Sequence, residues 1–192
     1  MTVELTGLAS QSAYLAVPAV LLAGITVALF FGRGEPFGTL NDLFSAVALL
    51  LLIPPVLGVR EKLGDAPGGW LLPLTIATVL GLALAGFGQM LLIVRVIDLS
   101  ASFVTGGLGI LPVLAWVAGL AWLSLGRQLL PTSLGWLSVL LLGAAILVAI
   151  FSGLKVGVAT WASATILVAA LLGWLVALGM AVQPGGPGSA VP

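Results

Sequence analysis

The segment QMLLIVRVIDLSASF, residues 89–103, places an arginine and an aspartate three positions apart beside a long apolar stretch. Inside a membrane, Arg95 and Asp98 could form an ion gate, because intramembrane charges commonly mark ion or substrate pathways. At a helix end they would instead be an interfacial anchor and its counter-ion. If the helix begins near Trp70, Arg95 lies 25 residues later, about 37 Å along the axis. This exceeds a hydrocarbon core of about 30 Å, so we favour the helix-end interpretation and expect Arg95 to pair with Asp98.

Gln89 is a polar residue within the same apolar stretch. Gly81, Ala85 and Gln89 are spaced by four residues and share one helix face. Small residues on such a face allow close helix packing in lipid. The amide of Gln89 needs a partner away from water, and we favour an interhelical hydrogen bond. If a polar cavity exists, Gln89 is the first residue that we expect to line it.

Asn41 and Asp42 lie in the segment GTLND at the start of another apolar stretch. Thr39 and Asp42 have the spacing of a capping box, in which each side chain satisfies a free backbone amide at a helix start. We therefore predict that these residues cap a helix. The alternative is that Asn41 and Asp42 form the entrance for a solute or a proton.

The chain contains no cysteine and no histidine. It therefore has no thiolate nucleophile, and no imidazole to bind zinc or haem or to act as a general base. The glycines of GRGEPFGT lack the spacing of a phosphate-binding loop. We predict no catalytic residue, no metal site and no cofactor, and we treat an enzyme as the minority interpretation.

The composition is that of a membrane protein. Of the 192 residues, 61% are hydrophobic and 6% are charged, and the mean hydropathy is +1.31. Soluble domains contain roughly 25% charged residues. Six basic residues balance six acidic ones, and no basic stripe is available for nucleic acid. We expect the lipid bilayer to be the main surrounding of this chain.

The apolar stretches predict an all-α, six-helix transmembrane bundle. We assign residues 1–182 to one domain and residues 183–192 to a disordered polar tail. Pro54 and Pro55 should kink or break the second helix, because proline lacks a backbone donor and clashes with the preceding turn. Pro112 should kink the fourth helix for the same reason. The predicted helices are 13–31, 41–59, 70–94, 104–125, 134–154 and 160–182.

The orientation in the membrane is nearly balanced under the positive-inside rule. The six basic residues divide equally between the two predicted sides. The close pair Arg60 and Lys62, together with the terminal amine, favours both termini in the cytoplasm. Trp70, Trp122 and Trp136 fall at helix ends on that same side, where indole rings are enriched at a membrane interface.

The segment PFGTLNDLFSAVALLLLIP, within residues 36–54, resembles the loop and second helix of uncharacterised small bacterial multi-pass membrane proteins. The resemblance implies a location in the bacterial inner membrane and no particular activity. From the residues, we expect a non-catalytic protein, either an accessory or scaffold subunit or a binder of a lipid-like ligand. The alternative is a small homo-oligomeric transporter or channel. The expected partners are accordingly another membrane subunit or further copies of the chain.

Overall fold

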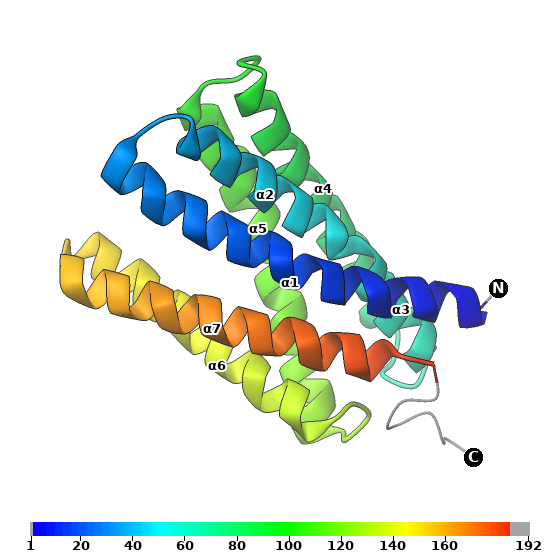
Figure 1. Ribbon diagram of the computed structural model, residues 1–192. Helices are drawn as coiled ribbons and strands as arrows, with labels where there is room; N and C mark the ends of the chain where they lie inside the picture. Colours follow the sequence, from blue (N-terminus) through cyan, green and yellow to red (C-terminus); the bar gives the residue numbers. More distant parts are fainter. Residues whose placement is uncertain (1, 185–192) are drawn as a thin grey trace.

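The computed structural model describes residues 2–184, and the regular elements of this part of the chain are all helices (Figure 1). The predicted all-helical architecture is therefore confirmed. The elements are α1 (Thr2–Arg33), α2 (Phe37–Leu51), α3 (Ile53–Leu63), α4 (Leu71–Ile93), α5 (Leu99–Ala121), the π-helical turn η1 (Trp122–Gly126), α6 (Thr132–Gly153) and α7 (Gly157–Val182).

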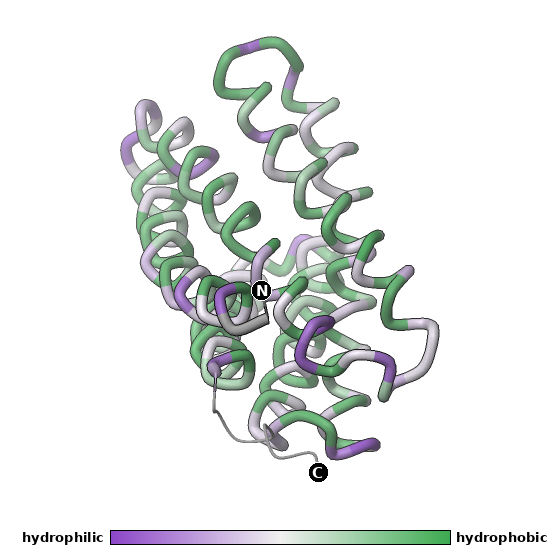
Figure 2. The backbone as a smooth tube through the Cα atoms, turned by 90° about the vertical axis from the view of Figure 1, so that its right-hand side faces the viewer, coloured by the Kyte–Doolittle hydropathy of each residue, from purple (hydrophilic) through white to green (hydrophobic). Residues whose placement is uncertain are grey.

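Six spans within residues 2–184 are long and apolar enough to cross a membrane. Two of them combine neighbouring elements, α2 with α3 and α5 with η1. Along the helices the residues are mainly hydrophobic, whereas hydrophilic residues gather near the turns (Figure 2). The spans are Glu4–Arg33, Phe37–Leu63, Leu71–Ile93, Leu99–Gly126, Thr132–Gly153 and Gly157–Val182.

The long helices form a ring. They pack in the order α1, α2, α4, α5, α6 and α7, and α7 returns to α1. The start of α1 and the end of α7 lie at one end of the molecule, which we call the terminal end (Figure 1). The α1–α2, α4–α5 and α6–α7 turns lie at the opposite end, the turn end. There the α4–α5 turn is widely separated from the α6–α7 turn.

The packed core occupies the terminal end. Its buried side chains come mainly from the middle of α3, from the later parts of α5 and α7 and from the beginnings of α4 and α6. Trp116 and Trp174 meet edge to face near its middle, with ring centroids 6.0 Å apart. The indole Nε1 of Trp174 donates to Ser138 Oγ at 2.9 Å. Core packing is therefore concentrated away from the turn end, where the helices separate.

Helices α4 and α5 approach each other through glycine. A side-chain carbon added at Gly81 would collide with the backbone carbonyl oxygen of Gly109. One added at Gly109 would lie 2.9 Å from Ala85 Cβ. The close packing expected of the face that carries Gly81 and Ala85 is therefore confirmed.

Several helix boundaries differ from those expected from hydropathy; for example, α5 begins at Leu99 instead of residue 104, and α3 extends to Leu63 instead of residue 59. Helix α1 begins at Thr2, well before residue 13, and hydroxyl groups of its third turn attach it to neighbouring helices. Ser10 Oγ donates to the carbonyl oxygen of Gly179 at 2.9 Å, and Ser12 Oγ donates to that of Leu51 at 2.7 Å. Helix α2 begins at Phe37 instead of residue 41.

The prolines of the second span act as expected. Helix α2 ends at Leu51 and α3 begins at Ile53, so the span is broken immediately before Pro54 and Pro55. Pro112 lies within α5, and its carbonyl oxygen accepts a hydrogen bond from Thr78 Oγ1 of α4 at 3.1 Å. Of the predicted C-terminal tail, residues 185–192 lie outside the described part of the chain.

Candidate functional site

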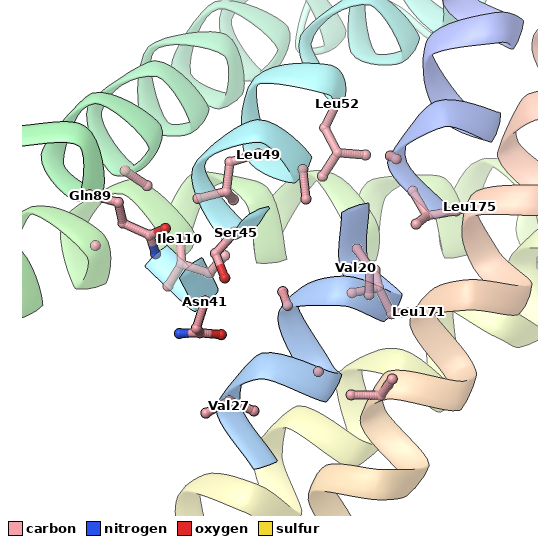
Figure 3. A pocket seen from close by; sticks show the side chains of 17 residues that line it. Val20, Val27, Asn41, Ser45, Leu49, Leu52, Gln89, Ile110, Leu171 and Leu175 are labelled. Atoms are coloured by element: carbon pink, nitrogen blue, oxygen red, sulfur yellow. The ribbon is translucent and has the colours of Figure 1, made fainter. Parts of the chain in front are cut away.

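A cavity of about 440 Å³ lies among α1, α2, α4, α5 and α7 (Figure 3). We call it the inner chamber. Most of its lining is aliphatic, including Val20 of α1 and Leu171 of α7. Asn41 and Ser45 of α2 and Gln89 of α4 provide its polar side chains. The chamber is therefore an apolar space with a polar wall on one side.

A second cavity of about 930 Å³ adjoins the inner chamber at the turn end. We call it the mouth, because the ends of α1 and α4 and the beginnings of α2 and α5 surround it. Its lining includes the charged residues Glu35, Asp42 and Arg95. Asn41 and Gln89 line both cavities. The inner chamber and the mouth are thus neighbouring parts of one space, which changes from apolar to charged toward the turn end.

Gln89 lies where the two cavities meet. Its Oε1 atom is buried and has no hydrogen-bond partner among residues 2–184, so this oxygen does not form the expected interhelical bond. The adjoining part of α5 explains why. Gly106 and Gly107 have no side chains, and Thr105 Oγ1 donates to the carbonyl oxygen of Ser102 within its own helix at 3.1 Å. The position of Gln89 instead matches the alternative that it lines a cavity.

The start of α2 is capped by Glu35 and not by the predicted Thr39–Asp42 box. Glu35 Oε2 accepts hydrogen bonds from the backbone N–H of Thr39 at 3.3 Å and from its hydroxyl at 3.0 Å. Thr39 is the third residue of the helix, so it is a donor to the cap. Asn41 Nδ2 donates weakly to Asp42 Oδ1 at 3.5 Å. Asn41 and Asp42 therefore lie in the cavity wall without capping the helix.

Arg95 and Asp98 lie between helices, because α4 ends at Ile93. The prediction that they form an ion pair is wrong. Among the described residues, the one ion pair joins Arg60 and Asp65 at 2.8 Å. The reason is the turn, in which Arg95 adopts a left-handed φ of 59°. The i to i+3 spacing brings two side chains together only while the helix continues.

Asp98 has a separate structural role. Its Oδ1 atom accepts hydrogen bonds from the backbone N–H of Ala101 at 2.8 Å and from Ser100 Oγ at 2.7 Å. Asp98 is thus the N-cap of α5. The hydrogen bond from Ala101, and to a smaller extent that from Ser100, lowers the pKa of the Asp98 carboxyl group by stabilising its charged form. Asp98 is not among the residues that line the mouth.

The charged groups of the mouth remain available for a bound molecule. Among residues 2–184, neither Arg95 nor the carboxylates of Glu35 and Asp42 form an ion pair. The same part of the chain contains no group of three or more acidic, histidine or cysteine residues placed to hold a metal ion. The arrangement offers charge and hydrogen bonding at the opening of an apolar space.

Sequence reasoning missed Ser45 and Glu35 as parts of this site. Ser45 follows Asn41 by four residues, so it lies on the same face of α2, and this spacing was an available signal. Glu35 belongs to the α1–α2 turn, and no sequence pattern indicated that this turn borders a cavity.

Comparison with known proteins gives no match. The chain fits no protein-family model, and no curated protein or solved structure is significantly similar to it. The resemblance of residues 36–54 to small bacterial membrane proteins therefore stays a prediction from the sequence.

Proposed function

We propose that this chain is an integral membrane protein that binds an amphipathic, lipid-like molecule. The observation that carries the proposal is the apolar inner chamber of about 440 Å³, which adjoins a charged mouth. Cavities of roughly 300–1,000 Å³ are typical of small-molecule sites, which combine apolar walls with a few polar groups. An acyl or other apolar tail would occupy the inner chamber, and a polar head would lie in the mouth.

The outer surface supports a membrane location. Large apolar side chains are exposed along the spans, among them Leu15, Leu80 and Ile146, and water would disfavour so much apolar surface. At the terminal end, the rings of Trp70 and Trp122 are 5.7 Å apart. Such an indole pair at helix ends is suited to a membrane interface.

We extend the proposal to location and orientation. A bacterial inner membrane with both termini in the cytoplasm would follow from the resemblance and from the pair Arg60 and Lys62. The mouth would then open toward the opposite side of the membrane, because it lies at the turn end. The expected role is non-catalytic, as a ligand binder that acts alone or as an accessory subunit of a larger membrane complex.

A small homo-oligomeric transporter or channel is the second candidate. It is favoured by the graded wall of the cavity, in which Asn41 and Gln89 connect the charged mouth with the inner chamber. Under this alternative, Gln89→Leu and Asp42→Asn would lower the transport rate while the protein still folds. Normal transport by both variants would exclude this pathway.

Filling the chamber tests the proposed binding. Gly24 lines the inner chamber, and a side-chain carbon added there meets no atom within 4 Å. We expect Gly24→Leu to reduce binding of a fluorescent single-chain amphiphile to the purified protein while it folds normally. Gly143→Leu is the matched control, because Gly143 of α6 also has open space but does not line the chamber. Equal binding by both variants would contradict the proposal.

A further inference from the structure

Resting on the proposed function, we infer that the bound amphiphile has a zwitterionic headgroup that combines an ammonium with a phosphate. The observation behind this inference is that Arg95, Glu35 and Asp42 line the same mouth and that none of them forms an ion pair within residues 2–184. One cation and two carboxylates therefore face one space without neutralising one another.

These charges come from three separate places in the fold. Arg95 belongs to the α4–α5 turn, Glu35 to the α1–α2 turn and Asp42 to the first turns of α2. Glu35 uses Oε2 to cap Thr39, and no hydrogen bond from another described residue reaches its Oε1. Within residues 2–184, Asp42 Oδ1 receives only the 3.5 Å contact from Asn41. Arg95 is an exposed residue, and it forms no ion pair within residues 2–184.

The headgroup must decide which amphiphile binds. An acyl chain that leaves the bilayer for the inner chamber exchanges one apolar surrounding for another, so the hydrophobic effect gives little preference. Polar contacts in the mouth then distinguish one lipid from another, through the favourable contacts of the correct head and the unfavourable contacts of a wrong one.

A zwitterionic phosphate headgroup matches each group in the mouth. Guanidinium binds phosphate through paired, charge-assisted hydrogen bonds, which assigns the phosphate to Arg95. The ammonium would lie against the carboxylates of Glu35 and Asp42. Its N–H groups are the kind of donor that the buried Gln89 Oε1 lacks. A purely anionic head would leave the two carboxylates without a counter-charge, and a purely cationic head would leave Arg95 without one.

Competition with the fluorescent amphiphile tests this headgroup assignment. The competitors are a single-chain phosphoethanolamine lipid, a single-chain phosphoglycerol lipid, a single-chain amine and free phosphoethanolamine. We expect the phosphoethanolamine lipid to compete at about tenfold lower concentration than the other lipids, as one charge-assisted contact of about 1.4 kcal/mol would give. Free phosphoethanolamine should be a weak competitor, because it has no tail for the chamber.

Matched variants assign each charge. Arg95→Gln should remove the preference over the amine, and the double variant Glu35→Gln, Asp42→Asn should remove the preference over the phosphoglycerol lipid. The controls are Lys155→Gln and Glu61→Gln, which change exposed charges outside the mouth lining and should keep both preferences.

The outcomes separate the headgroup assignment from the proposed function. Equal competition by all headgroups, or a preference for the anionic lipid, would overturn the zwitterionic assignment while leaving amphiphile binding intact. Strong competition by free phosphoethanolamine would also overturn it, because the ligand would then be a soluble phosphate compound. Failure of the fluorescent amphiphile to bind the wild-type protein would contradict the proposed function itself.

Discussion

Replacing Gln89 by leucine should stabilise the ligand-free protein while weakening ligand binding. In the structure, Gln89 Oε1 is buried without a hydrogen-bond partner among the described residues. A buried acceptor in this state costs about 1–3 kcal/mol relative to a satisfied or absent one. Leucine is similar in size and has no polar atom, so the exchange adds little packing strain.

The expected magnitude follows from these two effects. We predict that Gln89→Leu raises the free energy of unfolding of the ligand-free protein by about 1–2 kcal/mol. For a chain of this length, that change corresponds to a rise in Tm of about 2–8 °C. The leucine variant should also bind the fluorescent amphiphile more weakly, because the proposed headgroup contact is lost.

The assay is thermal unfolding in detergent after bound lipid has been removed from each protein. Gln11→Leu is the control, because Gln11 is exposed on α1 and does not line either cavity. The control should shift Tm little and leave binding unchanged. The reasoning would be refuted if Gln89→Leu lowered the free energy of unfolding by about 1 kcal/mol or more, on the order of one hydrogen bond. Such a loss would show that Gln89 has a hydrogen-bond partner within the protein.

Three further perturbations test separate parts of the fold. Gly81→Ala should lower the free energy of unfolding by about 1–3 kcal/mol through collision with α5, whereas Gly143→Ala in open space should not; similar Tm values would contradict the close α4–α5 contact. The pKa of Asp98 is lower in the folded protein than in the unfolded chain. The charged carboxylate therefore stabilises the fold above the unfolded pKa of about 3.9, and this stabilisation is lost as the pH falls through the folded pKa. Asp98→Asn, measured by unfolding from pH 7 to 3, should therefore lose less stability in acid than the wild type, and an unchanged acid dependence would contradict the capping role. In a chain without native cysteine, Arg95→Cys should react readily with a membrane-impermeant thiol reagent, and protection would show that this turn lies within the membrane.

Hydropathy predicted the elements of this fold well, because a helix that crosses lipid needs a long apolar run wherever its neighbours lie. Local chemistry also predicted the break beside Pro54 and Pro55 and the close approach at Gly81. Each of these features depends on the residue itself or on its own helix face.

The polar residues were harder to interpret, because their partners depend on helix ends and on distant segments. The expected pair of Arg95 and Asp98 failed because the chain turns after Ile93 and Asp98 caps the next helix. The cap of α2 comes from Glu35, which precedes the helix, and not from Thr39. In both places the helix begins earlier than predicted, at Leu99 for α5 and at Phe37 for α2.

The cavity itself could not be predicted from sequence. Its lining comes from five helices, and its existence depends on how these helices separate toward the turn end. Gln89 was an expected lining residue because it is a rare polar group in an apolar run. Ser45 was not a predicted lining residue, because a serine hydroxyl commonly forms a hydrogen bond within its own helix.

The central claim is that the inner chamber holds an amphipathic molecule, and native mass spectrometry of the protein released gently from its own membrane tests it most directly. The wild type and Gly143→Leu should retain one such molecule per chain, and Gly24→Leu should lose it. A wild-type protein that carries only a variable number of exchangeable lipids, with the same pattern in Gly24→Leu, would contradict the claim. A stoichiometric second polypeptide in place of a lipid would identify an accessory subunit instead.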